Sequence, residues 1–332
     1  MNDFLRLIRL PNLIIIILTM CGIRYGLLEA LWIHAAEILK AEGTSDPLIG
    51  HLHMPLIHFV ILLISVISIA AGGYIINDYF DIKADRINKP DRVFITSSTE
   101  RRTAILGHLV FSFIGLTCGI YLAWKVGNWK LASIHLFSII SLWFYSAFLK
   151  RQLLIGNILI AFMALLVPVT AGLFEMISGA VPSLERLDLY VFGEGTRLMI
   201  IGTILIAGYG IFAFLSNLLR EIIKDAEDMQ GDSNIGRKTM PLVLGEITTR
   251  YIILFFLFFT IFLLGMTQRY IYEEGMDLYF WYITIAIQIP LLALGVFIWR
   301  SKEKTDYTQC SLITKFIIVS GVISMFIFRY SF

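Results

Sequence analysis

Nine apolar stretches, most of them roughly 18–22 residues long and poor in charge, constrain this chain more than any other feature of its sequence. They cover residues 12–32, 55–76, 104–122, 131–149, 153–175, 198–219, 250–268, 278–298 and 310–329. A helix of this length crosses the roughly 30 Å of hydrocarbon in a bilayer, and hydrophobic residues make up 58% of the chain. The sequence therefore predicts an all-α, polytopic membrane protein with about nine transmembrane helices packed as a bundle.

Lysine and arginine residues are divided unevenly between the two sides of such a protein. They are concentrated in residues 1–11 and in the connections 77–103 and 220–249. Because cytoplasmic loops carry an excess of these residues, we expect the N-terminus and both connections to face the cytoplasm. The connections are expected to form cap loops on a single membrane domain, residues 1–332, in the cell (inner) membrane. The stretches 33–52 and 176–197 are expected outside the membrane, and no cleavable signal peptide is predicted.

Two groups of acidic residues follow the second and the sixth apolar stretches. Asn77, Asp81 and Asp85 recur every four residues, on one face of a helix, and Asp228 and Asp232 repeat this step. Their similar places in two four-helix halves suggest that the groups face each other. Stacked carboxylates repel unless a cation lies between them, and oxygen-rich sites suit Mg²⁺ held against substrate phosphates. The predicted Mg²⁺ ligands are Asn77, Asp78, Asp81, Asp85, Asp225, Asp228 and Asp232. The alternative is a pair of solvated acidic loops.

Basic residues surround both acidic groups. Because arginine and lysine neutralise the charge of a departing diphosphate, a catalytic role is predicted for some of them and for one tyrosine. These residues are Lys83, Arg86, Tyr145, Lys150, Arg220 and Lys224. The alternative is the ordinary positive charge of cytoplasmic loops. Arg24 lies inside the first apolar stretch, where a charge is costly. It is expected either to bind an anionic head group or to extend towards the membrane surface.

Four motifs in this order resemble the UbiA superfamily of intramembrane prenyltransferases. They are N-D-x-x-D-x-x-x-D at 77–85 with its continuation at 86–92, Y-S-x-x-L-K at 145–150, the Asp228/Asp232 pair, and G-R-K-T at 236–239. The resemblance covers nearly the whole chain. It implies a helical bundle around a central cavity open towards lipid. It also implies that Mg²⁺ on both Asp-rich motifs binds an isoprenyl diphosphate, whose carbocation is captured by a lipid-soluble acceptor. The ligands implied are Asn77, Asp81, Asp85, Asp228 and Asp232.

The segment 220–232 reads R-E-I-x-K-D-x-E-D-x-x-G-D and, with R-L-P-N at 9–12, is similar to the digeranylgeranylglyceryl phosphate synthase branch of that superfamily. The branch implies transfer of a geranylgeranyl group to geranylgeranylglyceryl phosphate, which forms an ether lipid. The predicted substrate-binding residues are Arg9, Asn12, Arg24, Asn88, Arg92 and Lys238. The run 93–96 and the insert at 33–52 depart from the superfamily pattern. They leave open an aromatic acceptor, as in quinone, haem or chlorophyll biosynthesis.

A cation-coupled membrane transporter is the alternative from a different functional class. Transporters place ion sites near the bilayer midplane, and Glu175 is the one carboxylate that this sequence offers there. Both acidic groups instead follow apolar stretches on the predicted cytoplasmic side, which favours the enzyme. No nucleic-acid partner and no obligate protein partner is expected.

Overall fold

The structure, a computed structural model, describes residues 3–41, 51–88, 95, 100–184, 194–234 and 236–331. Within these residues nine helical segments are long and apolar enough to span a membrane. They are Leu10–Ile38, Leu56–Lys83, Arg101–Lys125, Trp129–Ala147, Ile155–Ser178, Met199–Glu227, Glu246–Glu273, Asp277–Arg300 and Lys304–Phe328. Each overlaps one predicted stretch, so the prediction of an all-α, multi-pass membrane protein is confirmed.

The first half of the chain contributes five of these spans. Its elements are α1 (Asp3–Leu7), α2 (Leu10–Cys21), the π-helical η1 (Gly22–Leu28), α3 (Glu29–Ala41), α4 (Leu56–Asn88), α5 (Arg101–Lys125), η3 (Trp129–Leu131), α6 (Ala132–Ala147), η4 (Leu149–Arg151) and α7 (Ile155–Leu184). The second half contributes four. Its elements are α9 (Glu194–Glu227), α10 (Met229–Asn234), α11 (Met240–Leu244), α12 (Glu246–Glu273), α13 (Asp277–Ile283), η5 (Thr284–Gln288), α14 (Ile289–Arg300) and α15 (Lys304–Phe328).

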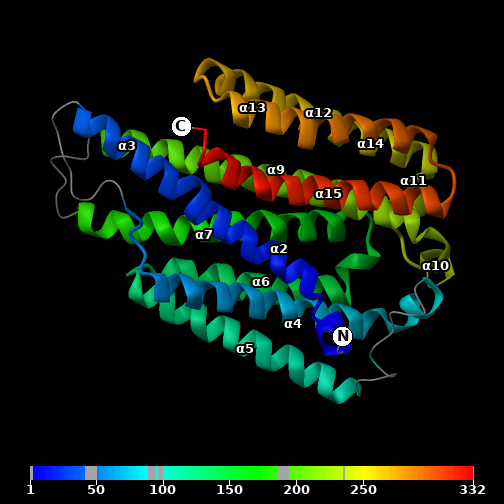
Figure 1. The fold of residues 1–332 in the computed structure, drawn as a ribbon. Coiled ribbons are helices and arrows are strands. Elements are labelled where there is room, and N and C mark those ends of the chain that lie inside the picture. The colour runs from blue at the N-terminus through cyan, green and yellow to red at the C-terminus, as the bar shows by residue number, and fades with distance from the viewer. Residues whose placement is uncertain are drawn as a thin grey trace.

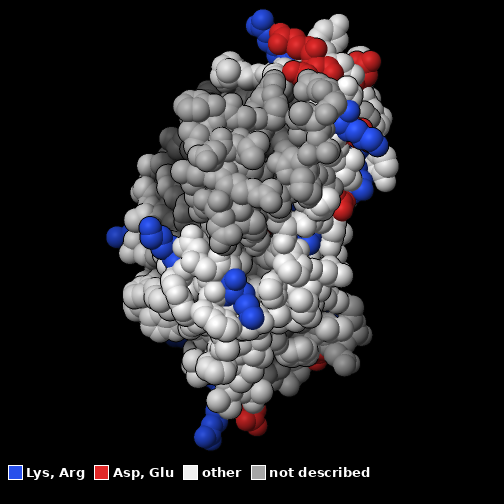
Figure 2. Space-filling view, turned by 90° about the vertical axis from the view of Figure 1, so that its left-hand side faces the viewer, with Lys and Arg blue, Asp and Glu red and all other residues white. Residues whose placement is uncertain are grey.

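The long helices lie side by side as a bundle (Figure 1). Helix α4 packs on α5 and α6, α7 packs on α9, and α9 packs on α12 and α15. The acidic groups lie at the end where α4, α9 and α10 meet, and α10 contacts α4 there. Figure 2 looks onto the opposite end, where lysine and arginine side chains are scattered over the described surface and a group of Asp and Glu side chains lies at the upper edge. We call the first of these the acidic end.

Several connections predicted from the sequence are helical in their first part. Residues 77–88 continue α4, and residues 220–227 and 229–234 form the end of α9 and α10. The sequence has no Gly or Pro between Asn77 and Asn88, so nothing interrupts the helix before the Lys89-Pro90 pair. Likewise α3 and α7 extend beyond the predicted spans, to Ala41 and Leu184. The acidic residues therefore stand on rigid helix ends, whereas most of 89–99 lies outside the described residues.

A buried ion pair joins three segments far from the acidic end. Arg24 Nη1 lies 3.0 Å from Glu175 Oε2, and the two side chains are only 4% and 1% exposed. Arg24 also donates a hydrogen bond to the carbonyl oxygen of Met54 at 2.5 Å. The backbone N–H groups of His53 and Met54 donate to Glu175 Oε1 at 2.6 and 3.0 Å. The pair thus connects η1 and α7 to the segment that enters α4.

Close packing of η1 against α15 depends on a glycine. A Cβ atom on Gly26 would lie 2.4 Å from the carbonyl oxygen of Met325, a distance that backbone atoms cannot accommodate without moving. Small residues allow helices in membranes to approach this closely. The contact holds the C-terminal half of α15 beside the first span. It thereby positions the face of α15 that lines the cavity.

Candidate active site

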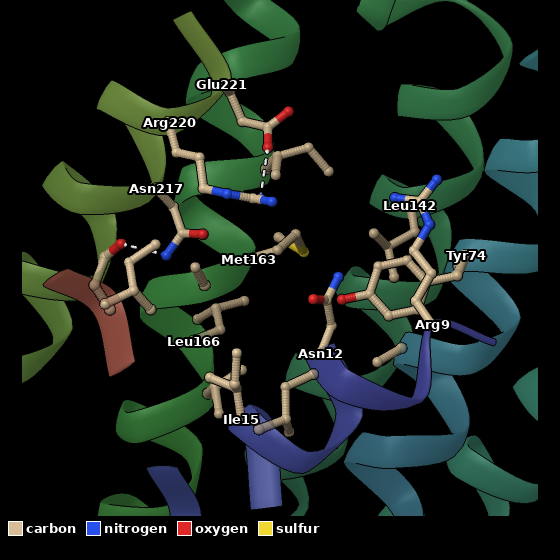
Figure 3. Close-up of a pocket in the computed structure, with 18 of the residues that line it drawn as sticks. Arg9, Asn12, Ile15, Tyr74, Leu142, Met163, Leu166, Asn217, Arg220 and Glu221 are labelled. Carbon is tan, nitrogen blue, oxygen red and sulfur yellow. Dashed lines mark hydrogen bonds and ion pairs between the residues drawn. The ribbon is translucent and has the colours of Figure 1, made fainter. Parts of the chain in front are cut away.

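A cavity of about 870 Å³ opens between α2, α4, α6, α7, α9 and α15 (Figure 3). Its volume is large for a small-molecule site, for which roughly 300–1,000 Å³ is usual. Polar residues line the part near the acidic end, and mainly apolar residues line the remainder. The polar part has two regions of different charge. We call them the acid set (Asn77, Asp81, Asp225, Asp228 and Asp232) and the basic set (Arg9, Arg220 and Lys224).

Arg237 connects the two acidic groups. Its guanidinium pairs with Asp81 on α4 through Nη2 and with Asp232 on α10 through Nη1, at 3.0 Å. Lys150 Nζ lies 2.8 Å from Asp81 and so forms a second ion pair with the same carboxylate. The two groups therefore face each other, as their positions in the sequence suggested, and cationic side chains lie between their carboxylates.

Backbone turns near Lys150 and Arg237 place both side chains beside Asp81. Gly236 has a φ of 69°, a left-handed conformation that favours glycine. The turn returns the N–H of Arg237 to the carbonyl oxygen of Asp232 at 3.0 Å. The N–H of Lys238 then donates to the carbonyl oxygen of Arg151 at 3.1 Å, which ties this segment to η4. Short-range turns thus place two cations on one carboxylate.

The remaining members of the acid set are also held by neighbours. Asn157 on α7 donates a hydrogen bond to Asp225 Oδ2 at 2.8 Å. Lys150 Nζ lies 3.4 Å from both the side-chain and the backbone oxygen of Asn77. Asp228 lines the same cavity at the junction of α9 and α10. The set offers carboxylate and amide oxygens on helix ends, the ligand type that Mg²⁺ prefers.

The oxygens of the acid set fit a hard divalent cation, although its acids are spread apart. Within the described residues, no group of three or more Asp, Glu, His or Cys side chains lies close enough to hold a metal ion. The side chain of the predicted ligand Asp85 is outside that description. Arg237 and Lys150 already supply positive charge between Asp81 and Asp232. A bound Mg²⁺ would therefore share or replace these contacts.

Burial and neighbouring charges shift the pKa values of two groups here that lie outside the spans. Burial, with a further contribution from Asp228, raises the pKa of Asp232 to about 6, against the opposing effect of Arg237. Burial also acts to lower the pKa of Arg237, but the carboxylates of Asp81 and Asp232 outweigh it and raise that pKa. Arg237 thus stays charged, and Asp232 gains a proton in mildly acidic solution.

The basic set lies across the cavity from α2 to α9 (Figure 3). Arg9 pairs with Asp78 at 2.6 Å and lies over the ring of Tyr74 at 5.1 Å. Its backbone has φ 52° and ψ 53°, an uncommon conformation for a non-glycine residue that costs about 1–2 kcal/mol. Such strain concentrates at functional sites. The left-handed backbone conformation of Arg9 directs the chain into α2 at the residue that pairs with Asp78.

Glu221 organises the α9 side of the basic set. Its Oε1 lies 2.6 Å from Lys224 Nζ and 3.6 Å from Arg220 Nη1. Figure 3 shows the Arg220 and Glu221 side chains facing the cavity, with Asn12 and Tyr74 opposite them. Three cations therefore surround two carboxylates, Asp78 and Glu221, and leave a net positive region beside the acid set.

The structure brings together most of the predicted site residues and leaves others apart. Those that line the cavity are Arg9, Asn12, Asn77, Asp78, Asp81, Tyr145, Arg220, Lys224, Asp225, Asp228 and Asp232. Lys150 reaches Asp81 without lining the cavity. Lys83, Arg86 and Lys238 are exposed, and Arg24 is paired with Glu175 far from the acid set. The side chains of Asp85 and Asn88 and the whole of Arg92 lie outside the described residues.

Sequence reasoning assigned no site role to several residues that line the cavity. Tyr74, Glu221, Arg237 and Lys315 are among them. Arg237 stands in the G-R-K-T motif, but the motif does not say which acid it pairs with. Lys315 lies within the last apolar stretch, so the rule that marks an intramembrane charge as functional could have identified it, as it did Arg24.

Comparison with known proteins places these observations in a family. The model of the UbiA prenyltransferase family matches residues 39–319. A digeranylgeranylglyceryl phosphate synthase of Thermococcus gammatolerans is 31% identical over 225 residues, which cover 67% of this chain and 70% of that protein. A second synthase of that name, from Pyrococcus horikoshii, is 31% identical over 230 residues, 69% of this chain and 72% of that protein.

Solved structures share the fold. A structure described as digeranylgeranylglyceryl phosphate synthase in membranes has a TM-score of 0.61 and 21% identity, with 98% of each chain covered. A UbiA homologue from Archaeoglobus fulgidus bound to GPP and Mg²⁺ has a TM-score of 0.56 and 18% identity, covering 98% of this chain and 99% of that one. With the extent of the family match, these findings identify the chain as a multi-pass membrane prenyltransferase that belongs to the UbiA family.

Proposed function

We propose that this protein uses Mg²⁺ to transfer a geranylgeranyl group from its diphosphate to geranylgeranylglyceryl phosphate, forming an ether lipid. The observation that carries this proposal is that one cavity holds an acid set and a basic set next to each other. The acid set suits a diphosphate that arrives with divalent cations. The basic set suits an acceptor that brings a negative charge of its own. The named relatives support the same acceptor.

The chemistry asks the protein mainly to position charges. The bond between the allylic carbon and the diphosphate oxygen breaks, and the acceptor hydroxyl oxygen forms a bond with that carbon and releases its proton. When bound at Asn77, Asp81, Asp228 and Asp232, Mg²⁺ would neutralise negative charge on the leaving diphosphate. Lys150 lies 2.8 Å from Asp81, and Arg237 forms an ion pair with the same carboxylate. Both side chains would add fixed positive charge beside the leaving diphosphate. No protein nucleophile is required.

The transporter alternative loses its main support in the structure. Glu175, the carboxylate considered for a midplane ion site, is buried in an ion pair with Arg24 and accepts two backbone hydrogen bonds. A carboxylate with these partners has its charge already matched. Family membership as a prenyltransferase agrees with this assignment.

We further propose that the acidic end faces the cytoplasm of the inner membrane. Basic residues are concentrated at that end, among them Arg6, Arg86, Lys150, Arg237 and Lys238. An excess of lysine and arginine marks cytoplasmic loops. Water-soluble Mg²⁺ and diphosphate would then meet the site from the cytoplasm.

A transfer assay tests the proposal directly. The purified protein in liposomes receives labelled geranylgeranyl diphosphate with geranylgeranylglyceryl phosphate and 4-hydroxybenzoate as competing acceptors, with Mg²⁺ or with EDTA. We expect label in the glyceryl phosphate product only, and only with Mg²⁺. Labelling of the aromatic acid alone would assign the protein to the aromatic-acceptor alternative.

The pKa of Asp232 predicts how the Mg²⁺ requirement depends on pH. Above about pH 6 this side chain is a carboxylate that can bind a cation, and below it a proton competes. We therefore expect the apparent dissociation constant for Mg²⁺ to rise as pH falls below 6, by up to about tenfold per pH unit. Mg²⁺ titrations of activity at pH 5.5 and 7.5 measure this change. The same Mg²⁺ requirement at both pH values would contradict the prediction.

A further inference from the structure

We infer that Lys315, on α15, binds the phosphate of the acceptor and so selects an anionic lipid over a neutral or purely aromatic acceptor. The inference rests on the proposed function and adds a residue and a subsite to it. Lys315 lines the cavity and lies near the middle of the span Lys304–Phe328. Placing a lysine at the centre of a transmembrane helix costs about 2.5–3.5 kcal/mol, so such residues mark binding sites or buried partners.

Lys315 has no such partner among the residues that the structure describes. The part of the chain that the structure describes gives its ammonium group no hydrogen bond and no ion pair. By contrast, Arg24, another cation inside a span, is matched by Glu175. The compensating negative charge for Lys315 must therefore come from something that enters the cavity. Both substrates of the proposed reaction are anionic. Which of them Lys315 binds must therefore be inferred from its location in the cavity.

The position of α15 favours the acceptor. Helix α15 packs on α9, η1 and α2. Helix α2 begins directly after Arg9, and α9 carries Arg220 and Lys224, so Lys315 approaches from the side of the basic set. The acid set lies mainly on α4, at the end of α9 and on α10. Lys315 adds a further cation to the cavity that holds Arg9, Arg220 and Lys224. Against Asp78 and Glu221, which pair with these three, the four cations leave an excess of positive charge that matches a phosphate monoester at neutral pH.

The face of α15 beyond Lys315 suits a lipid tail. Ile318, Gly321, Val322 and Met325 follow it at helical spacing and line the same cavity. An amphiphile with its phosphate at Lys315 would lay its tail along this stripe. A different apolar wall, from α6 and α7, includes Ile134, Leu142, Met163 and Val167. The cavity thus has one apolar wall for each of two lipid substrates.

The test compares Lys315→Gln with two other variants. Lys315→Arg keeps the charge, and Lys302→Gln removes an exposed lysine just before α15 as a matched control. Steady-state kinetics in liposomes give the KM of each substrate. We expect Lys315→Gln to raise the KM of geranylgeranylglyceryl phosphate by about 10- to 100-fold, the effect of losing one charged hydrogen bond. The KM of geranylgeranyl diphosphate should stay within about twofold, and Lys302→Gln should match the wild type.

Binding measured without turnover separates this inference from the proposed function. Thermal shifts of the detergent-solubilised protein are recorded with geranylgeranylglyceryl phosphate and with its dephosphorylated alcohol. We expect the phosphate to stabilise the wild type and Lys315→Arg more than Lys315→Gln, and the alcohol to affect all three alike. Equal stabilisation of wild type and Lys315→Gln by the phosphate, or a raised KM for the diphosphate substrate instead, would overturn the inference alone. No binding and no transfer in the wild type would overturn the proposed function itself.

Discussion

Replacing Asp81 with alanine is expected to reduce kcat by about 10³-fold or more, equivalent to roughly 4 kcal/mol of transition-state stabilisation. Asp81 is the carboxylate on which Lys150 and Arg237 converge. It is also predicted as a Mg²⁺ ligand from the α4 side. Its loss would remove this predicted ligand and release the two cations that the diphosphate would meet. Activity is measured as label transferred at saturating substrates, over a range of Mg²⁺ concentrations.

Two further variants make the Asp81 experiment specific. Asp228→Ala removes a predicted ligand from the opposite side of the acid set and should have a similar effect. Asp277→Asn changes an exposed acid at the start of α13, and should leave kcat unchanged. Folding is checked by the elution volume in detergent and by the melting temperature. Wild-type turnover with an ordinary Mg²⁺ requirement in Asp81→Ala or Asp228→Ala would remove that residue from the ligand set.

Breaking the Arg24–Glu175 pair is expected to destabilise the protein more than any single change at the cavity. Removing one partner of a buried ion pair leaves an uncompensated charge, which costs about 3–5 kcal/mol. Arg24→Ala would leave Glu175 with only its backbone partners, and Glu175→Ala would leave Arg24 unmatched. We expect each variant to unfold at a clearly lower temperature in detergent than the wild type.

The double variant Arg24→Met/Glu175→Leu tests whether charge is the cause. Replacing both members of a buried pair by apolar residues is often neutral or stabilising. The double variant should therefore be more stable than either single variant. Arg269→Ala, which breaks an exposed pair with Glu273, should cost less than about 0.5 kcal/mol. Single variants as stable as the wild type would show that the pair contributes nothing to the fold.

The variants of Arg24 and those of Lys315 together distinguish the roles of two intramembrane cations. Arg24 and Lys315 look alike in the sequence, since each is a basic residue in the interior of an apolar stretch. Arg24 has a carboxylate partner 3.0 Å away and belongs to the scaffold. Lys315 lines the cavity, and the described part of the chain offers it no carboxylate partner. The cost of a charge inside the membrane is thus offset by a protein carboxylate for Arg24. For Lys315 we propose that a bound substrate phosphate offsets it.

The sequence alone was sufficient for the spans and for the helical spacing of the acidic residues that we predict as Mg²⁺ ligands. The number of spans follows from apolar length, because a helix in lipid satisfies its own backbone hydrogen bonds whatever surrounds it. The spacing of Asn77 and Asp81 follows from helical periodicity. Helix ends were less predictable, since α3, α4 and α7 all continue past the limits of the apolar composition. Polar residues can extend a helix when no Gly or Pro interrupts it.

Only the tertiary structure decided which charges meet. Asp81 and Arg237 are 156 positions apart, and Glu175 lies 122 positions from the backbone of His53 that it binds. Neither pairing has a local pattern, because both depend on how α4, α7 and α10 pack. The orientation of Lys315 towards the cavity likewise depends on α15 packing between α2 and α9. Local spacing determined where the carboxylates stand on their helices, and long-range packing determined which cations they face.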